Sequence, residues 1–189
     1  MTLQNVDRNE NVGAYIARYS YETLRLYAYL LIGFLVPFTL GHPQELVGII
    51  VNATLILGAI EIGPVWRVAP LLFAPSLGVL ARGLIFGPFT PFLIIMLPFI
   101  WTGNAILVFG FRELYRKRRI NYGITLGISA LVKSGFLFLS AFVLVSASIL
   151  PVLFLTAMGI TQLFTALTGG VLAFGLHKSG ITRLRGFDS

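Results

Sequence analysis

Long apolar runs separated by short breaks containing Pro or Gly are the main pattern of this 189-residue chain. A helix that crosses a bilayer needs about 20 apolar residues, with a range of roughly 17–25 that tilting permits. Six segments of this kind follow one another along the chain. They cover about Leu24–Leu40, Glu45–Gly63, Val65–Phe86, Phe92–Phe111, Asn121–Ser148 and Pro151–Leu176. The pattern predicts an all-α polytopic membrane protein, a bundle of six transmembrane helices.

The six segments divide the chain into an N-terminal segment (residues 1–23), a transmembrane domain (24–177) and a basic tail (178–189). The N-terminal segment contains no uninterrupted apolar run, so we do not expect a secretory signal peptide. Pro70 and Pro75 lie inside the third apolar segment. Because proline removes a helical hydrogen bond, this segment is expected to be kinked or broken.

The distribution of Lys and Arg predicts the orientation. With an even number of spans both termini share a side, and that side holds most basic residues: Arg8, Arg18, Arg25, Arg67, Arg112, Arg116, Lys117, Arg118, Arg119, Lys178, Arg183 and Arg185. The opposite connections (41–44, 87–91, 148–151) contain none. The positive-inside rule therefore predicts cytoplasmic termini in a multi-pass protein of the cell (plasma) membrane. The net charge of +7 then reflects topology and contact with anionic lipids, and no nucleic-acid partner is expected.

Lys133 is the most unusual residue of the predicted spans, because it lies near the middle of a long run that is otherwise free of charge. A cation at that depth is costly and is expected to face a protein interior or a watered cavity. No acidic residue lies at a comparable depth, so Lys133 is expected either to contact an anionic ligand or to cap helix carbonyls. Arg82, closer to the outer end, would either grip the same anion or extend to the headgroups.

Other polar residues lie at depths that would let them line one cavity opening outward. The candidate substrate-binding residues are Lys133, Arg82, Asn52, Asn104, Gln162, Trp101 and Thr165. For each amide or hydroxyl taken alone, the alternative is a hydrogen bond that merely joins two helices, worth about 1 kcal/mol in membranes. Near the second turn, Glu61 and Arg67 are expected to form an ion pair at the membrane boundary.

Catalytic and metal-binding signatures are missing from the sequence. It contains no cysteine, no HExxH motif and no Walker A motif, and His42 and His177 are predicted to lie on opposite membrane faces. We therefore expect no enzyme activity, catalytic residues, metal site or cofactor. Any use of ATP would have to come from another subunit.

Four segments carry a resemblance to a known family. They are Val47-Gly48-Ile49-Ile50-Val51-Asn52-Ala53, Pro98-Phe99-Ile100-Trp101-Thr102-Gly103-Asn104-Ala105, Gly127-Ile128-Ser129-Ala130-Leu131-Val132-Lys133 and, most specific, Gln162-Leu163-Phe164-Thr165-Ala166-Leu167-Thr168-Gly169-Gly170-Val171-Leu172-Ala173. Together with six spans, cytoplasmic termini and a basic loop before the fifth span, the chain resembles the substrate-binding S component of energy-coupling factor (ECF) transporters.

The resemblance implies an uptake subunit that binds a vitamin or other micronutrient from the outer side. Its partners would be a membrane coupling protein and two cytoplasmic ATPases, and it would topple in the membrane to release its ligand. Two family features are absent. Ala28 is followed at the fourth position by Ile32 instead of the Ala of the AxxxA coupling pattern, and the start Met1-Thr2-Leu3 lacks the Met-His of nickel and cobalt subtypes.

Two hypotheses follow. The first is a substrate-binding uptake subunit with a ligand pocket in the outer half that contains Lys133 and Gln162. The alternative is a non-catalytic structural or assembly subunit of a larger membrane complex, in which Lys133 would contact protein. Partner helices would then cover the faces formed by small residues four positions apart, which are Ala74-xxx-Gly78, Gly123-xxx-Gly127, Ala166-xxx-Gly170 and Gly169-xxx-Ala173.

Overall fold

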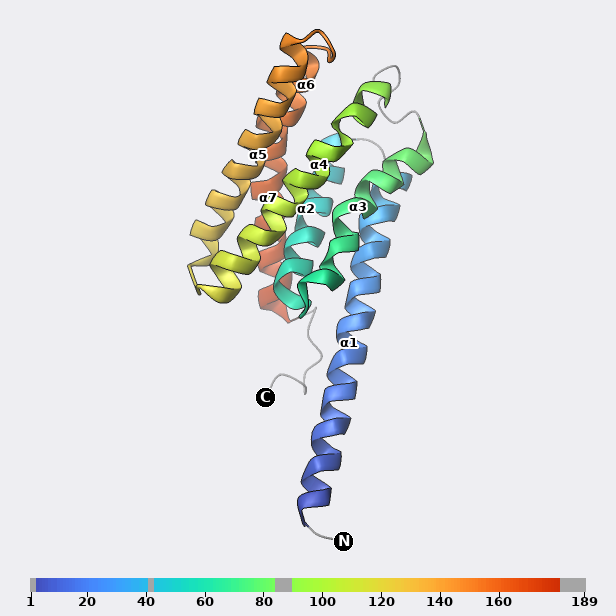
Figure 1. Ribbon diagram of the computed structural model, residues 1–189, viewed down its shortest axis with the longest axis vertical. Coiled ribbons are helices and arrows are strands. Elements are labelled where there is room, and N and C mark those ends of the chain that lie inside the picture. Colours follow the sequence, from blue (N-terminus) through green and yellow to red (C-terminus); the bar gives the residue numbers. More distant parts are fainter. Residues whose placement is uncertain (1–2, 41–42, 84–89, 181–189) are drawn as a thin grey trace.

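The computed structural model describes residues 3–40, 43–83 and 90–180, and every regular element in these ranges is a helix (Figure 1). The helices are α1 (Leu3–Thr39), α2 (Gln44–Glu61), α3 (Val65–Arg82), α4 (Thr90–Gly110), its π-helical continuation η2 (Phe111–Lys117), α5 (Tyr122–Ser146), α6 (Leu153–Met158) and α7 (Ile160–Ser179). The predicted all-α class is confirmed.

The helices run alternately up and down (Figure 1). We call the end at which α1, α3 and α5 finish the upper end, and the end at which α2 and α7 finish the lower end. α1 begins, and α7 ends, on the lower side, and the first turns of α1 extend well below the other helices. α1 packs mainly against α3, and α2 mainly against α7.

Five helical stretches among the described residues are long and apolar enough to cross a membrane, which confirms the polytopic class. They are α2, α3, α4 with η2, α5, and α6 with α7. α1 is not one of them, because it is charged over its first half and its apolar part covers only residues 24–39. A sixth crossing by α1 stays a prediction.

Residues 65–82 of the third apolar segment form one helix, α3, in spite of its two prolines. Pro75 is buried, and it lies close to Gly33 of α1. The neighbouring Gly78 lets the two helices approach: a Cβ atom built there would lie 2.2 Å from the carbonyl oxygen of Phe34. The Ala74-xxx-Gly78 spacing therefore belongs to the α1–α3 contact.

Gly78→Ala is expected to destabilise the protein. The added methyl group would collide with the backbone of α1, which cannot move aside as a side chain could, so a loss of about 1–3 kcal/mol is expected. The midpoint of thermal unfolding in detergent measures it. The matched control is Gly127→Ala on α5, where the new methyl group meets no atom within 4 Å. Equal midpoints for the two variants would contradict the close approach of α1 and α3.

The sixth apolar segment is interrupted, whereas the sequence predicted one continuous helix over 151–176. α6 ends at Met158 and α7 begins at Ile160. At Gly159 the backbone turns away from helical geometry (φ −95°, ψ −97°). A side chain there would meet Leu155 O at 2.8 Å and Phe138 at 2.9 Å.

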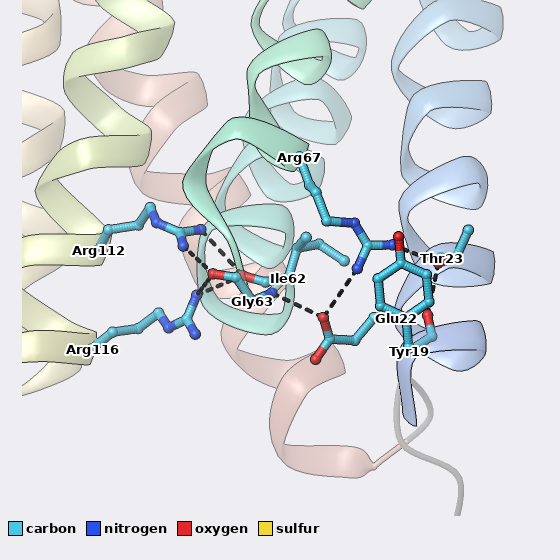
Figure 2. Close-up of polar contacts among 8 residues, drawn as sticks. All are labelled: Tyr19, Glu22, Thr23, Ile62, Gly63, Arg67, Arg112 and Arg116. Carbon is cyan, nitrogen blue, oxygen red and sulfur yellow. Dashed lines mark hydrogen bonds and ion pairs between the residues drawn. The ribbon is translucent and has the colours of Figure 1, made fainter. Parts of the chain in front are cut away.

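Arginine side chains hold the α2–α3 turn at the lower end (Figure 2). Arg112 donates to the carbonyl oxygens of Ile62, at 3.1 Å, and Gly63, and Arg116 donates to Ile62 O at 2.6 Å. From the other side, the Gly63 amide donates to Glu22 of α1 at 3.1 Å. Cations are favourable at these carbonyls because the last carbonyls of a helix have no partner within it.

The predicted Glu61–Arg67 pair is wrong. Arg67 pairs with Glu22 at 3.4 Å (Figure 2), and the buried carboxylate of Glu61 pairs with Arg25 at 3.4 Å and with His177 at 2.9 Å. The reason is that α1 continues below the apolar region and places Glu22 and Arg25 beside the turn. The local sequence around Glu61 and Arg67 does not reveal these partners on α1.

The apolar core of the described residues consists of two clusters. The lower one is centred on α2 and includes Leu55, Ile56 and Phe111. The upper one joins α4, α5 and α6 and includes Met96 and Leu137. Asn52, Asn104 and Lys133, three of the residues predicted to bind a ligand, are buried as well.

Candidate ligand-binding site

The ammonium group of Lys133 lies at the meeting point of three helices. Its side chain projects from α5 and is 2% exposed. Nζ donates to Asn52 Oδ1 of α2 at 2.6 Å and to Asn104 Oδ1 of α4 at 3.1 Å. These are side-chain amide oxygens, so Lys133 does not cap main-chain carbonyls among the described residues.

Both amides are held in place by further hydrogen bonds. Asn52 Nδ2 donates to Thr165 Oγ1 of α7 at 3.2 Å, and Asn104 Nδ2 donates to Leu72 O of α3 at 3.1 Å. With its NH₂ group engaged in this way, each amide turns its oxygen toward the ammonium group. Five helices thus contribute to one network, which fixes the position of a single buried charge.

The charge of Lys133 is not neutralised within the part of the chain that the structure describes. The described ion pairs all lie at the lower end and use Glu22, Glu61 and Glu113. Asn52 and Asn104 are the only described acceptors for Nζ, and an ammonium group has three N–H donors. When the side chain is protonated, one N–H donor and its positive charge therefore remain for another species.

A pocket of about 120 Å³ begins at Lys133. Its floor holds Lys133, Asn52 and Asn104, and its lining reaches Gln44, the first residue of α2, at the upper end. At a rise of about 1.5 Å per residue, the path along α2 from Gln44 to Asn52 is about 12 Å long. The side walls are mainly apolar and comprise Val47, Val51, Val79, Leu93, Leu97 and Ile100. The pocket is thus polar and charged at its floor and apolar above it.

Five of the seven predicted site residues lie around this pocket. Lys133, Asn52, Asn104, Gln162 and Thr165 all line it. Thr165 is buried and donates to Gln162 O at 3.2 Å, which ties the first turn of α7 to the network. The structure therefore brings together residues from four segments that are distant in sequence.

Arg82 and Trp101 do not line the pocket. Arg82, at the upper end of α3, donates to the carbonyl oxygens of Phe38, at 3.3 Å, and Thr39, at 2.6 Å, in the last turn of α1. Those carbonyls lack partners within their own helix, which explains why they attract the guanidinium group. The Trp101 ring packs edge-on against Phe73 of α3, with 5.1 Å between ring centroids.

Sequence reasoning missed most of the remaining lining residues, and three of them are informative. Ser76 is a buried hydroxyl on α3, Gln44 lies in what was read as a turn, and Met158 ends α6. Ser76 could have been found as a polar residue within an apolar span. Gln44 and Met158 gave no such signal, because their positions depend on the start of α2 and on the break at Gly159.

Comparison with protein-family models, with curated proteins and with solved structures gives no match for this chain. Inference about its function therefore rests on the fold and on the pocket.

The chemistry of the site favours an anion. Burying an ammonium group costs several kcal/mol, and two neutral amide oxygens compensate only part of that cost. A carboxylate or phosphate oxygen above Nζ would supply the missing charge and accept the remaining N–H donor. The apolar walls would contact the uncharged body of the same molecule, as is usual in small-molecule sites.

Proposed function

We propose that this chain is the membrane-embedded substrate-binding subunit of an ECF-type uptake transporter, with a vitamin or other micronutrient that carries an anionic group as its substrate. One observation carries the proposal. The buried ammonium group of Lys133 has no described carboxylate as a counter-charge. It lies at the floor of a pocket whose lining extends to the upper end of the bundle. A structural ion would be expected to have its counter-charge within the protein.

The direction of the pocket supports uptake from outside. Arg67, Arg112, Arg116 and Lys117 lie at the lower end of the bundle, and the pocket lining reaches the upper end. Under the positive-inside rule the lower end is cytoplasmic and the pocket faces outward. A substrate would then bind from the outer side, with its anionic group entering first.

The exposed side of α1 is a surface on which a membrane partner could pack. Ala28 and Ile32, which take the place of the usual AxxxA coupling pattern, are both exposed there, next to Leu31, which is 58% exposed. We propose that lipid or a coupling protein covers this side, and that the coupling protein connects the chain to two cytoplasmic ATPases.

Purification of the tagged full chain from its native membrane in mild detergent tests the proposal. We expect two ATPase chains and a membrane coupling protein to co-purify, identified by mass spectrometry. Stable inclusion in an energy-converting complex without such ATPases would contradict uptake and favour the alternative, a non-catalytic assembly subunit. The exposed apolar residues of α1 are compatible with either partner, so the identity of the partners decides between the two.

A further inference from the structure

A second hollow adjoins the pocket at the upper end. It has a volume of about 220 Å³ and lies between the first turn of α2 and helix α6. Gln44, Met158 and Thr161 line both the hollow and the pocket, so the two spaces are neighbours. The hollow is lined by one charged residue, Glu45.

Glu45 and Lys133 mark the two ends of this combined space with opposite charges. Glu45 is exposed at the upper end, and no described residue forms an ion pair or a hydrogen bond with its carboxylate. Along α2, Glu45 precedes Asn52, the partner of Lys133, by a path of about 10 Å at about 1.5 Å per residue. The wall between them is mainly apolar, with Val47 and Val51 on the α2 side.

We infer that the substrate is an elongated zwitterion, with its anionic group at Lys133, a cationic group at Glu45 and an apolar body between them. This inference rests on the proposed function and narrows its substrate class. A carboxylate at the rim repels ligands with a second negative charge at that end and attracts those with a positive one. Specificity by repulsion of the wrong ligand and attraction of the right one is common at binding sites.

Two soluble probes of similar length separate the charge types. Aminooctanoate carries an ammonium group at the end opposite its carboxylate, and octanedioate carries a second carboxylate there. Binding of each to the full chain in lipid nanodiscs can be measured by isothermal titration calorimetry. We expect the wild-type protein to bind aminooctanoate roughly tenfold more tightly than octanedioate. Glu45 attracts the ammonium group of the first probe and repels the second carboxylate of the other, and both interactions are small because Glu45 is exposed to water.

Charge reversal at the rim provides the decisive comparison. Glu45→Lys is expected to reverse the preference toward octanedioate, and Glu45→Gln to remove it. Glu113→Lys, which reverses an exposed charge at the lower end, is the matched control and should leave the preference as in the wild type. Aminobutanoate, too short to reach both charges, should bind more weakly than aminooctanoate.

The outcomes distinguish this inference from the proposed function. Equal binding of the two long probes to the wild type, or an unchanged preference in Glu45→Lys, would overturn the zwitterion inference. Anion binding that still depends on Lys133 would leave the proposed function in place. If the wild type binds none of the probes, the zwitterion inference is overturned. If Lys133→Met binds them as well as the wild type, the anion site at Lys133 on which the proposed function rests is overturned too.

Discussion

Lys133→Met is expected to abolish retention of the anionic substrate and, at the same time, to stabilise the empty protein. Removing one partner of a buried charge pair costs about 2–5 kcal/mol, which corresponds to a loss of affinity of roughly 30-fold or more. The empty protein, in contrast, no longer buries a charge without a counter-charge. Methionine keeps the length and flexibility of the side chain, so the packing of α5 should survive.

Two measurements on the same samples check the expected loss of ligand retention and the expected gain in stability. Native mass spectrometry reports the small molecule retained through purification, and thermal unfolding of ligand-free protein reports stability. Arg82→Met is the matched control, because it removes a cation from the upper end outside the pocket and should leave retention unchanged. If the empty Lys133→Met protein instead unfolds at a lower temperature and retention is unaffected, Lys133 has a structural role.

Glu61→Ala is expected to give the largest loss of stability. The Glu61 side chain is 2% exposed and contacts Arg25, Tyr29 and His177, from α1 and α7. Its removal leaves the partly buried guanidinium group of Arg25 without this counter-charge. Breaking a buried pair in this way costs about 3–5 kcal/mol. The shift of the unfolding midpoint in detergent measures the effect.

Glu113→Gln is the matched control for Glu61→Ala. Glu113 pairs with Lys117 at 3.2 Å and Arg118 at 3.0 Å, but all three side chains are exposed. Exposed ion pairs contribute little, since water and salt screen them. The midpoint of this variant should therefore stay close to that of the wild type. If both variants lower the unfolding midpoint by a similar amount, the burial of Glu61 does not increase the stabilisation that its ion pairs give.

The convergence of Lys133, Asn52 and Asn104 follows from depth alone. All three are polar, lie well inside apolar helices and find no partner on their own helix. Lipid offers them no hydrogen bonds, so they turn to the interior and meet there. The sequence could therefore name these residues as candidates for one lining, but it could not predict the rotation of each helix and so left open whether they converge.

Residues near the helix ends were harder to predict, because several partners are within reach there. Arg82 bonds the last carbonyls of α1, Arg67 bonds Glu22, and Glu61 bonds His177 at the far end of the sequence. These choices depend on how far α1 extends below the bundle and on how each helix is rotated. At Gly159 a side chain would collide with Phe138, a residue distant in sequence, and no local pattern reveals this neighbour.

The most direct test is an experimental structure of the wild-type protein purified from its native membrane with its ligand retained. We expect density for a small molecule in the pocket, with a carboxylate or phosphate oxygen about 2.7–3.2 Å from Lys133 Nζ, the range of a hydrogen bond. An empty, closed bundle in which Lys133 contacts only protein groups would contradict a role for this residue in binding substrate.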